Sequence, residues 1–298
     1  MKIGYACINM TLSKDKITTN RSMIKKTFLE KGINYASELA LLNVQDMEKI
    51  IHWNVQHGIY FFRTSSNVFP WGSEYNFDDL PHINEIKTVL KRIGDYATEH
   101  GVRLTCHPGP FNVLGSPTEK VVLNTIVDLE LHGRVFDMMG LSHTPYNKIN
   151  IHCNGTYGNK EATMERFCRN FDRLSDSVKS RLTIENDDKA SMYSVKDLMQ
   201  IHNTIGIPIV FDYHHHQFCT GDLSEEEALN LAVSTWNNGI TPVVHYSESK
   251  SLHENDTKIK PQAHSDYIHT LPNTYGLDVD IMLETKQKEL ALLKVIKK

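Results

Sequence analysis

Eight short apolar runs recur at fairly regular intervals along the chain, and longer amphipathic stretches separate them. The runs are almost continuous in apolar and β-branched residues, which is typical of parallel strands buried on both faces. We expect strands at 2–8, 59–64, 102–107, 149–153, 181–186, 208–212, 241–246 and 279–284.

The stretches between these runs place apolar residues at helical spacing. They predict helices at 38–56, 83–99, 161–178, 194–204, 224–237 and 286–296, and a further helix that opens at Pro117. Strands that alternate with helices indicate a parallel sheet, and eight such units fit a closed (β/α)8 TIM barrel. We therefore expect an α/β fold in which residues 1–298 form a single domain. An open doubly wound sheet is the alternative, but no Gly-x-Gly-x-x-Gly motif follows the first strand.

The composition is that of a globular protein: 40% of the residues are hydrophobic, and 32 basic against 36 acidic residues give a net charge of −4. No apolar run approaches the roughly 18 residues that cross a bilayer, and the first residues show no signal-peptide pattern. The five cysteines include no Cys-x-x-Cys pair, which argues against a disulfide framework. We expect an intracellular monomer, in the cytoplasm or the nucleus, with no membrane partner and no nucleotide cofactor.

Sixteen histidines are unusually many for this length, and several of them lie at the ends of predicted strands. Six consecutive strands carry an imidazole or a carboxylate at or next to the carboxyl end, namely His107, His152, Glu185, Asp212, His245 and Glu284. His215 follows Asp212 by three residues, and His264 follows the seventh strand. In a parallel barrel these strand ends lie on one face, where barrel enzymes build their active sites.

This residue set suits divalent metal ions. Carboxylates packed together repel one another unless cations neutralise them, and neutral imidazoles complete a mixed nitrogen and oxygen shell. Five histidines and three carboxylates exceed the needs of one tetrahedral zinc, so we expect two or three ions, with Glu185 or Glu284 as a bridge. Such clusters carry out in-line displacement at phosphorus.

Each of these residues alone also has a simpler interpretation. His107 and His152 could be core histidines, Asp212 could cap a helix, and 185–188 could be a solvated acidic turn. Their occurrence on successive strand ends favours the metal site. Two cysteines, Cys106 and Cys153, each neighbour a candidate ligand and should therefore pack outward, beneath the helices.

The chain resembles the UV damage endonuclease family, TIM-barrel nucleases related in architecture to the AP endonucleases of the endonuclease IV type. The resemblance lies in the motifs at 3–5 with Asn9, 63–66 with Pro70, 104–108 through 116–117, 149–152, 155–160, 182–189, 211–215, His245 with 264–267, and 282–288. These motifs run from one end of the chain to the other.

The resemblance implies a metal-dependent cut in duplex DNA immediately 5′ to pyrimidine photodimers, and it extends the expected substrates to abasic sites. It implies a manganese cluster, with Zn²⁺ or Mg²⁺ as alternatives, held by the eight strand-end residues. We expect Glu185, Glu284 and His245 to be catalytic. Glu185 would bridge an ion held by Asp212, His245 and Glu284 and one held by His107 and His152, and His215 would hold a third ion with His264 or Glu74.

The family's DNA-contacting positions correspond here to Tyr5, Asn9, Pro110, Phe111, Tyr157, Lys160 and Lys286. Of these, Tyr5 and Asn9 match residues that face the lesion, and the two lysines match positions that could contact phosphate. Because the net charge gives no general attraction to DNA, a local patch must supply it, for which Lys250, Lys258, Lys260, Lys286 and Lys288 are the candidates. The aromatic residues Phe69 and Phe77 could either stack on bases or form a small core beneath a loop.

Three positions depart from the family pattern. Glu74 lies near the place where a histidine ligand usually follows Pro70, and Pro110 replaces a glutamine that helps to wedge the duplex, while Phe111 keeps the aromatic partner. Val243 stands where the family can carry a carboxylated lysine. These departures leave two alternatives open, which are a metal-dependent sugar isomerase or epimerase on the same barrel and a divergent damaged-DNA-binding protein with weakened nuclease activity.

Overall fold

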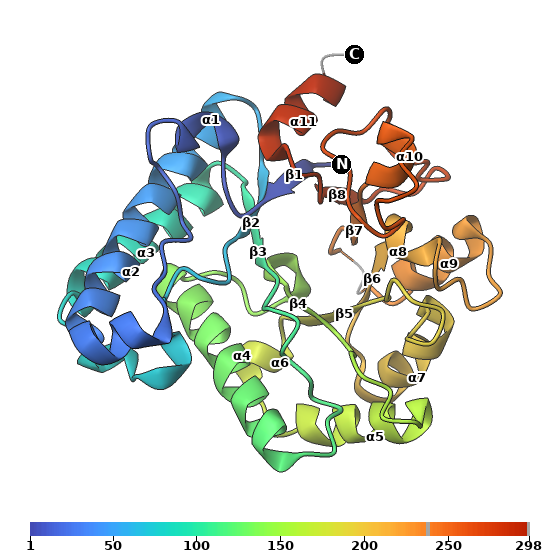
Figure 1. The fold of residues 1–298 in the computed structure, drawn as a ribbon, viewed down its shortest axis with the longest axis horizontal. Coiled ribbons are helices and arrows are strands. Elements are labelled where there is room, and N and C mark those ends of the chain that lie inside the picture. The colour runs from blue at the N-terminus through green and yellow to red at the C-terminus, as the bar shows by residue number, and fades with distance from the viewer. Residues whose placement is uncertain (237–238, 297–298) are drawn as a thin grey trace.

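The computed structural model describes residues 1–236 and 239–296, and within these ranges eight parallel strands close into a barrel in chain order (Figure 1). The strands are β1 (Ile3–Ala6), β2 (Phe61–Thr64), β3 (Arg103–Cys106), β4 (Ile149–His152), β5 (Leu182–Glu185), β6 (Ile209–Asp212), β7 (Val243–Tyr246) and β8 (Asp280–Leu283). Each strand falls inside a predicted range, and β8 pairs with β1 to close the ring. The predicted TIM barrel is therefore confirmed.

Helices surround this ring. They are α1 (Met10–Ser13), α2 (Lys25–Gln56), α3 (Ile83–Glu99), α4 (Glu119–Met139), α5 (Lys160–Phe171), α6 (Asp176–Lys179), α7 (Val195–Ile205), α8 (Tyr213–His216), α9 (Glu225–Val233), α10 (Lys250–Glu254) and α11 (Lys288–Ile296). Among the residues that the structure describes, none of these helices is long and apolar enough to span a bilayer.

The helix predictions differ from the structure at several boundaries. The helix expected to open at Pro117 begins at Glu119, after the N-cap Thr118, and the helix expected at 286–296 begins at Lys288. The helix expected at 38–56 begins earlier, at Lys25, with a break at Gly32, whose φ is 66°. The helix expected at 161–178 is two helices, because the extended backbone of Ser175 starts α6 and its side chain accepts a hydrogen bond from the Val178 amide. The helix expected at 224–237 ends at Val233, and its last predicted residue lies outside the described residues.

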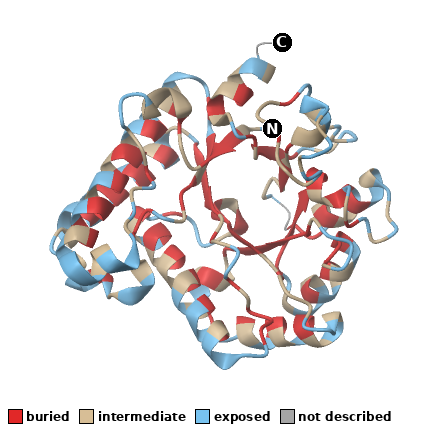
Figure 2. Cartoon of the chain, in the orientation of Figure 1, coloured by how far each residue is buried: buried red, intermediate tan, exposed pale blue. Residues whose placement is uncertain are grey.

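Two apolar layers flank the strands. The strands and the inward sides of the helices are buried, as Figure 2 shows. Cys106 and Cys153 lie in the core between strands and helices, as expected from their position beside the candidate ligands. In the loop after β2, Phe69 and Phe77 are buried and stack with ring centroids 4.3 Å apart, so they form a small core rather than a base-stacking surface.

The middle of the barrel interior is apolar. Phe61, Val210, Val243 and Met282 belong to the interior apolar cluster. Val243 therefore supplies packing where a carboxylated lysine could have supplied an oxygen. Gly4 is required next to this cluster, since a Cβ atom there would lie 2.5 Å from the Phe61 carbonyl oxygen.

At the amino-terminal end of the strands, the barrel is closed by a buried ion pair. Arg103 at the start of β3 donates to Asp280 at the start of β8, with 2.9 Å between Nη1 and Oδ2. The same guanidinium donates to the carbonyl oxygens of Pro145, Tyr146 and Thr241. This end of a TIM barrel generally serves stability, which leaves the opposite end for chemistry.

Candidate metal centre

The polar residues predicted at the strand ends gather at the carboxyl-terminal mouth of the barrel. Because all strands are parallel and the ring is closed, residues that end neighbouring strands become direct neighbours. His152 of β4 is the Cα partner of Glu185 of β5, and Asp212 of β6 is the Cα partner of His245 of β7. Strand pairing alone therefore brings these side chains together.

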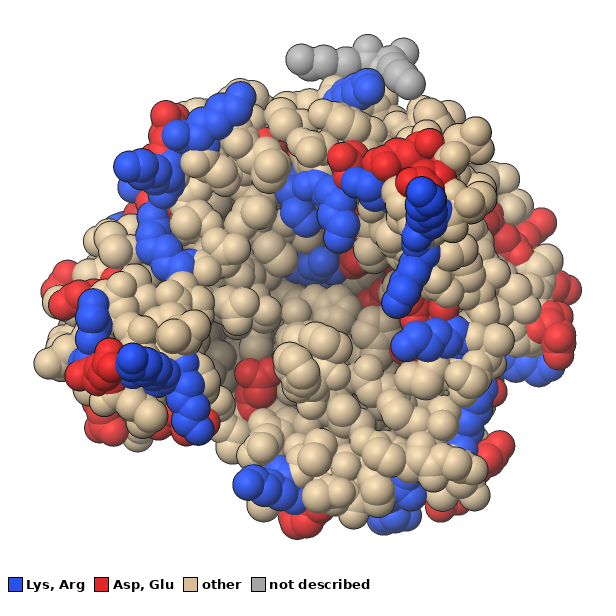
Figure 3. All heavy atoms as spheres, in the orientation of Figure 1, with Lys and Arg blue, Asp and Glu red and all other residues tan. Residues whose placement is uncertain are grey.

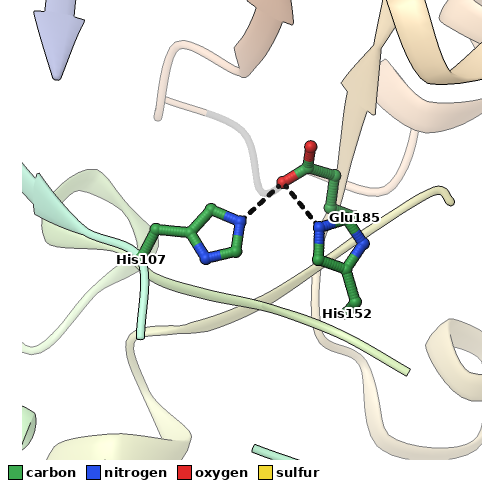
Figure 4. Close-up of side chains that lie close together, drawn as sticks. All are labelled: His107, His152 and Glu185. Carbon is green, nitrogen blue, oxygen red and sulfur yellow. Dashed lines mark hydrogen bonds and ion pairs between the residues drawn. The ribbon is translucent and has the colours of Figure 1, made fainter. Parts of the chain in front are cut away.

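Glu185 lies at the centre of this arrangement. Its Oε2 atom is 3.1 Å from His107 Nε2, 3.8 Å from His152 Nε2 and 3.1 Å from His245 Nδ1. Its Oε1 atom is 3.4 Å from His215 Nδ1. Figure 4 shows His107 and His152 converging on the carboxylate from separate strands. One buried carboxylate thus contacts imidazoles from several strand ends.

The donor atoms fall into two groups at this mouth, within the described part of the chain. His107, His152 and Glu185 form one, and Glu185, Asp212, His245 and Glu284 form the other, with the donor atoms of each group within 4.8 Å of one another. Glu185 belongs to both groups. Such an arrangement is suited to two cations that share one carboxylate.

Asp212 has two roles. Its Oδ1 atom accepts a hydrogen bond from the His215 amide, 2.8 Å away, and so caps the short helix α8 that holds His215. Its Oδ2 atom is buried and has no hydrogen-bond partner among residues 1–236 and 239–296. A buried carboxylate oxygen without a donor is unfavourable. A cation at this position would satisfy it, so the donor set fits a metal ion.

The two glutamates are held as anions. Burial opposes ionisation of Glu185, but the imidazoles of His245 and His152 outweigh it and hold its pKa well below the usual range. Burial also opposes ionisation of Glu284, but the guanidinium of Arg63 and the His245 imidazole lower its pKa strongly. Both carboxylates are therefore available as charged ligands near neutral pH.

The imidazoles respond in opposite directions to this environment. Burial lowers the pKa of His107 to about 4, against the opposing effect of Glu185. Burial also disfavours a charged His152, but the carboxylates of Glu185 and Asp187 outweigh it and raise its pKa to about 10. His107 is therefore neutral at pH 7, whereas His152 carries a proton that a cation must displace.

Four supporting residues were not identified from the sequence. Asn150 donates to Glu185 Oε2 and accepts from the Thr183 hydroxyl at 2.7 Å, so a polar ladder inside the barrel fixes the carboxylate. Arg63 pairs with Glu284, and Lys148 Nζ lies 3.1 Å from His245 Nε2. Burial lowers the pKa of Lys148 to about 7. The two-residue repeat of a strand was the available signal, since 148 and 150 lie on the same side as 152.

The predicted third ligand group is only partly brought together. His264 lies next to His215, with ring centroids 6.3 Å apart, and its Nδ1 atom is 2.6 Å from the Ser247 hydroxyl. Glu74 is exposed and belongs to neither donor group. It instead lines a cavity of about 560 Å³ beside Pro110 and Phe111. The structure therefore does not support Glu74 as a metal ligand. Of the two residues proposed to help His215 hold a third ion, His264 is the one that lies beside it.

A comparison with known proteins identifies the family. A family model described as UV-endonuclease UvdE matches residues 1–298. The chain belongs to this family. Similar UvdE relatives include a putative UV-damage endonuclease of Acanthamoeba polyphaga mimivirus, 32% identical over 99% of this chain and 90% of that protein. The UV-damage endonuclease of Schizosaccharomyces pombe is 35% identical over 100% of this chain, which corresponds to 50% of the yeast protein.

Solved structures agree with this assignment. The crystal structure of SacUVDE matches with a TM-score of 0.86 and 33% identity, over 100% of this chain and 97% of that one. Endonuclease IV from Thermus thermophilus matches with a TM-score of 0.58 and 11% identity, over 99% and 96% of the two chains, which shows a common fold. The structure of L-ribulose 3-epimerase matches with a TM-score of 0.54 and 11% identity, over 81% of this chain and 76% of that one. This similarity shows a common fold, so the epimerase alternative is supported by the fold alone. The predicted family and enzyme class, an endonuclease, are confirmed.

Within the UvdE framework, the predicted DNA-facing residues divide into two sets. Phe111, 87% exposed, and Tyr157, 49% exposed, present aromatic rings to solvent, and Pro110 and Lys286 are exposed as well. Lys160, by contrast, pairs with Asp197 at 3.1 Å. Figure 3 shows a hollow over the centre of the barrel, bordered by Lys and Arg side chains on the side where α10 and α11 lie.

The expectation that Tyr5 and Asn9 face a lesion is not supported. Both side chains are fully buried. The Tyr5 hydroxyl donates to Asn54 of α2 at 2.6 Å, and Asn9 donates to that hydroxyl at 2.9 Å. In this conformation the two residues join β1 to the surrounding helices and offer no atoms to a bound strand.

Proposed function

We propose that this chain is a metal-dependent endonuclease that cuts double-stranded DNA immediately 5′ to UV photolesions such as pyrimidine dimers. The observation that carries the proposal is the position of Glu185 in two donor groups at the mouth of a barrel of the UV-endonuclease family. The names of the relatives, UV-damage endonucleases, support damaged DNA as the substrate.

The donor set favours a cluster of divalent ions. Asp212, His245 and Glu284 would hold one ion, His107 and His152 a second, with Glu185 shared between them. His215, together with His264, would hold a third ion. Mixed imidazole and carboxylate ligands suit Mn²⁺, with Zn²⁺ and Mg²⁺ as alternatives. Such ions supply an activated water and stabilise the leaving oxygen at phosphorus.

The residues of the chain prepare this chemistry before DNA arrives. Asn150 holds the Glu185 carboxylate, and Arg63 holds Glu284, so the two central ligands are fixed by hydrogen-bonded partners. Glu185 and His245 are closed off from solvent, whereas 18% of the His107 side chain, 16% of the His152 side chain and 14% of the Glu284 side chain are exposed. We infer that the scissile phosphate approaches along the barrel axis, over the partly exposed rim formed by these three side chains.

Recognition of damage requires contacts outside the centre. The exposed rings of Phe111 and Tyr157 are suited to stack on bases whose pairing a photolesion has weakened. Lys286 is exposed beyond the end of β8 and can contact a DNA phosphate. Such a local positive charge is needed because the net charge of −4 does not attract DNA. We infer an enzyme that acts as an intracellular monomer on DNA.

The test is a nicking assay with supercoiled plasmid, irradiated or undamaged, after removal of metal with a chelator and addition of Mn²⁺, Zn²⁺ or Mg²⁺ in turn. We expect nicking of the irradiated plasmid only, restored best by Mn²⁺, with a 3′-hydroxyl at the nick. Equal nicking of both plasmids would refute lesion specificity. Binding of the irradiated plasmid without nicking under any of the metals would identify a damaged-DNA-binding protein instead.

A further inference from the structure

A second group of metal-ligand residues lies in the loop that follows β7. The donor atoms of Glu248, His253 and His269 all lie within 4.8 Å of one another. None of the three belongs to the strand-end groups described above. We propose that they bind a divalent metal ion, with Zn²⁺ preferred, at a site separate from the catalytic centre. This inference is independent of the proposed function.

The three residues come from three different parts of one long loop. Glu248 follows the end of β7, His253 lies in α10, and His269 lies in the segment that returns toward β8. The Glu248 carboxylate pairs with His253 Nε2, and the rings of His253 and His269 stack in parallel, 4.0 Å apart with an interplanar angle of 6°. The two imidazoles therefore lie face to face beside one carboxylate, and one ring must rotate about its side-chain bonds for both nitrogens to reach a single ion.

The backbone of the loop holds these residues in place. The Lys250 amide donates to the Ala263 carbonyl at 2.7 Å, and the Ser265 amide donates to the Glu248 carbonyl at 2.8 Å. These hydrogen bonds join the segment that leaves β7 to the segment that returns toward β8. Because backbone hydrogen bonds already join both sides of the loop, binding of an ion would cost little further conformational entropy of the chain.

Hydrogen bonds also orient the carboxylate. Glu248 Oε1 accepts from the His269 amide at 2.9 Å and from the Tyr246 hydroxyl at 3.2 Å, which leaves Oε2 facing His253. Partners of this kind fix the orientation of metal ligands in known sites. Lys250, two residues after Glu248, is paired with Asp266 at 3.0 Å and with Glu254 at 3.2 Å, so its charge is already balanced.

The chemistry of the group points to zinc. Two histidines and one glutamate form a ligand set that zinc uses when its remaining position is left to water. About a sixth to a fifth of the Glu248 and His253 side chains is exposed, 19% and 16%, and His269 is exposed. Water can therefore complete the coordination shell.

An ion at this site would act on the loop as a whole. Between its ligands the chain also carries His264, whose Nδ1 lies 2.6 Å from the Ser247 hydroxyl and which stands beside His215. Joining Glu248 and His253 to His269 would cross-link the outgoing and returning segments on either side of that histidine. The site would thus hold the loop closed and keep His264 at the barrel mouth.

The first experiment counts metal ions. The full chain is freed of metal with a chelator, reloaded with Zn²⁺, desalted and analysed for zinc per chain. We expect His253→Ala and His269→Gln each to hold one zinc fewer than the unmodified chain, and circular dichroism establishes that they are folded. His82→Ala is the matched control, since His82 also lies beside a glutamate, 3.4 Å from Glu85, but belongs to none of the three donor groups found among the described residues.

The second experiment separates this site from the catalytic one. In His152→Ala, the loop ion should remain although the strand-end centre is damaged. At zinc 100 times its dissociation constant, proteolysis within 250–269 should slow about 100-fold in the unmodified chain and not in His253→Ala. Equal zinc content in the unmodified chain and both loop variants, or a loss in His82→Ala as large as in His253→Ala, would overturn the proposal. Zinc that leaves the proteolysis rate unchanged would overturn it as well.

Discussion

The buried pair of Arg103 and Asp280 allows a quantitative test of how the barrel is built. In the variant Asp280→Asn, the shape of the side chain is kept and its charge is removed. The guanidinium of Arg103 is completely buried, and burial already lowers its pKa despite the neighbouring carboxylate. The substitution therefore leaves a buried cation without its counter-charge.

The size of the effect follows from the partners of both residues. Removing one member of a buried ion pair costs about 3–5 kcal/mol. Arg103 keeps its bonds to three carbonyl oxygens, which places the loss near the lower end. Asp280 also accepts from the Lys2 amide at 2.6 Å, and an asparagine cannot accept from both donors. We expect a loss of about 3 kcal/mol, or roughly 5 °C in Tm for a chain of this length.

The measurement is denaturant unfolding of the metal-free chain. Asp278→Asn is the control, because the Asp278 side chain is 76% exposed and, among the residues that the structure describes, pairs only with the amino terminus. Its removal should change stability by less than about 0.5 kcal/mol. Nicking by Asp280→Asn below its Tm should be unchanged, since the pair lies at the opposite end of the barrel from the candidate metal centre. A loss below about 1 kcal/mol would refute the reasoning, because it would mean that the guanidinium is not desolvated.

Three further predictions concern the centre, the surface and the pH response. Glu185→Gln should reduce nicking by at least about 1000-fold, because both donor groups lose their shared charge. Binding of irradiated duplex in a gel-shift assay should persist. Nicking at the original rate would exclude this carboxylate from the mechanism. Phe111→Ala should leave stability unchanged but weaken binding to irradiated duplex about 5- to 150-fold, as expected for the loss of one stacked base, and unchanged affinity would remove Phe111 from the interface. Burial of Asp46 favours a higher pKa, but hydrogen bonds from Lys49 and Arg21 outweigh it, so the pKa of Asp46 is lowered in the folded protein. The ionised carboxylate therefore stabilises the fold above the pKa of the unfolded chain, and this contribution is lost as the pH falls through the folded-state pKa. Asp46→Asn should therefore cost about 2 kcal/mol in unfolding experiments at pH 7, and this cost should shrink as the pH falls below the ordinary range of a carboxyl group, whereas a cost independent of pH would contradict the assignment.

The sequence predicted the fold and the gathering of the strand-end residues because both depend on local patterns. Short β-branched runs specify buried parallel strands, and parallel strands necessarily bring their carboxyl ends to one face. Knowing that His152, Glu185 and Asp212 end neighbouring strands is therefore enough to place them together. The two interpretations of Asp212, helix cap and ligand, turned out to be compatible, since each uses a different oxygen.

The sequence could not predict contacts that depend on the width and filling of the barrel. The partner of Tyr5 is Asn54, 49 residues away, and nothing near either residue signals this bond. Lys148 lies one residue before β4, and its proximity to His245 depends on how deeply the interior is filled. Glu74 shows the same difficulty for loops, because its distance from the mouth depends on the path of the chain after β2.

The membership of Glu185 in both donor groups has a consequence for how such a chain can change over evolutionary time. A substitution at His107 or at Glu284 alters one group and leaves the other with its own residues. A substitution at Glu185 alters both groups in a single step, and one that removes the carboxylate takes the shared charge from both. Among descendants of this chain, we expect loss of position 185 to mark lineages that have abandoned cutting altogether.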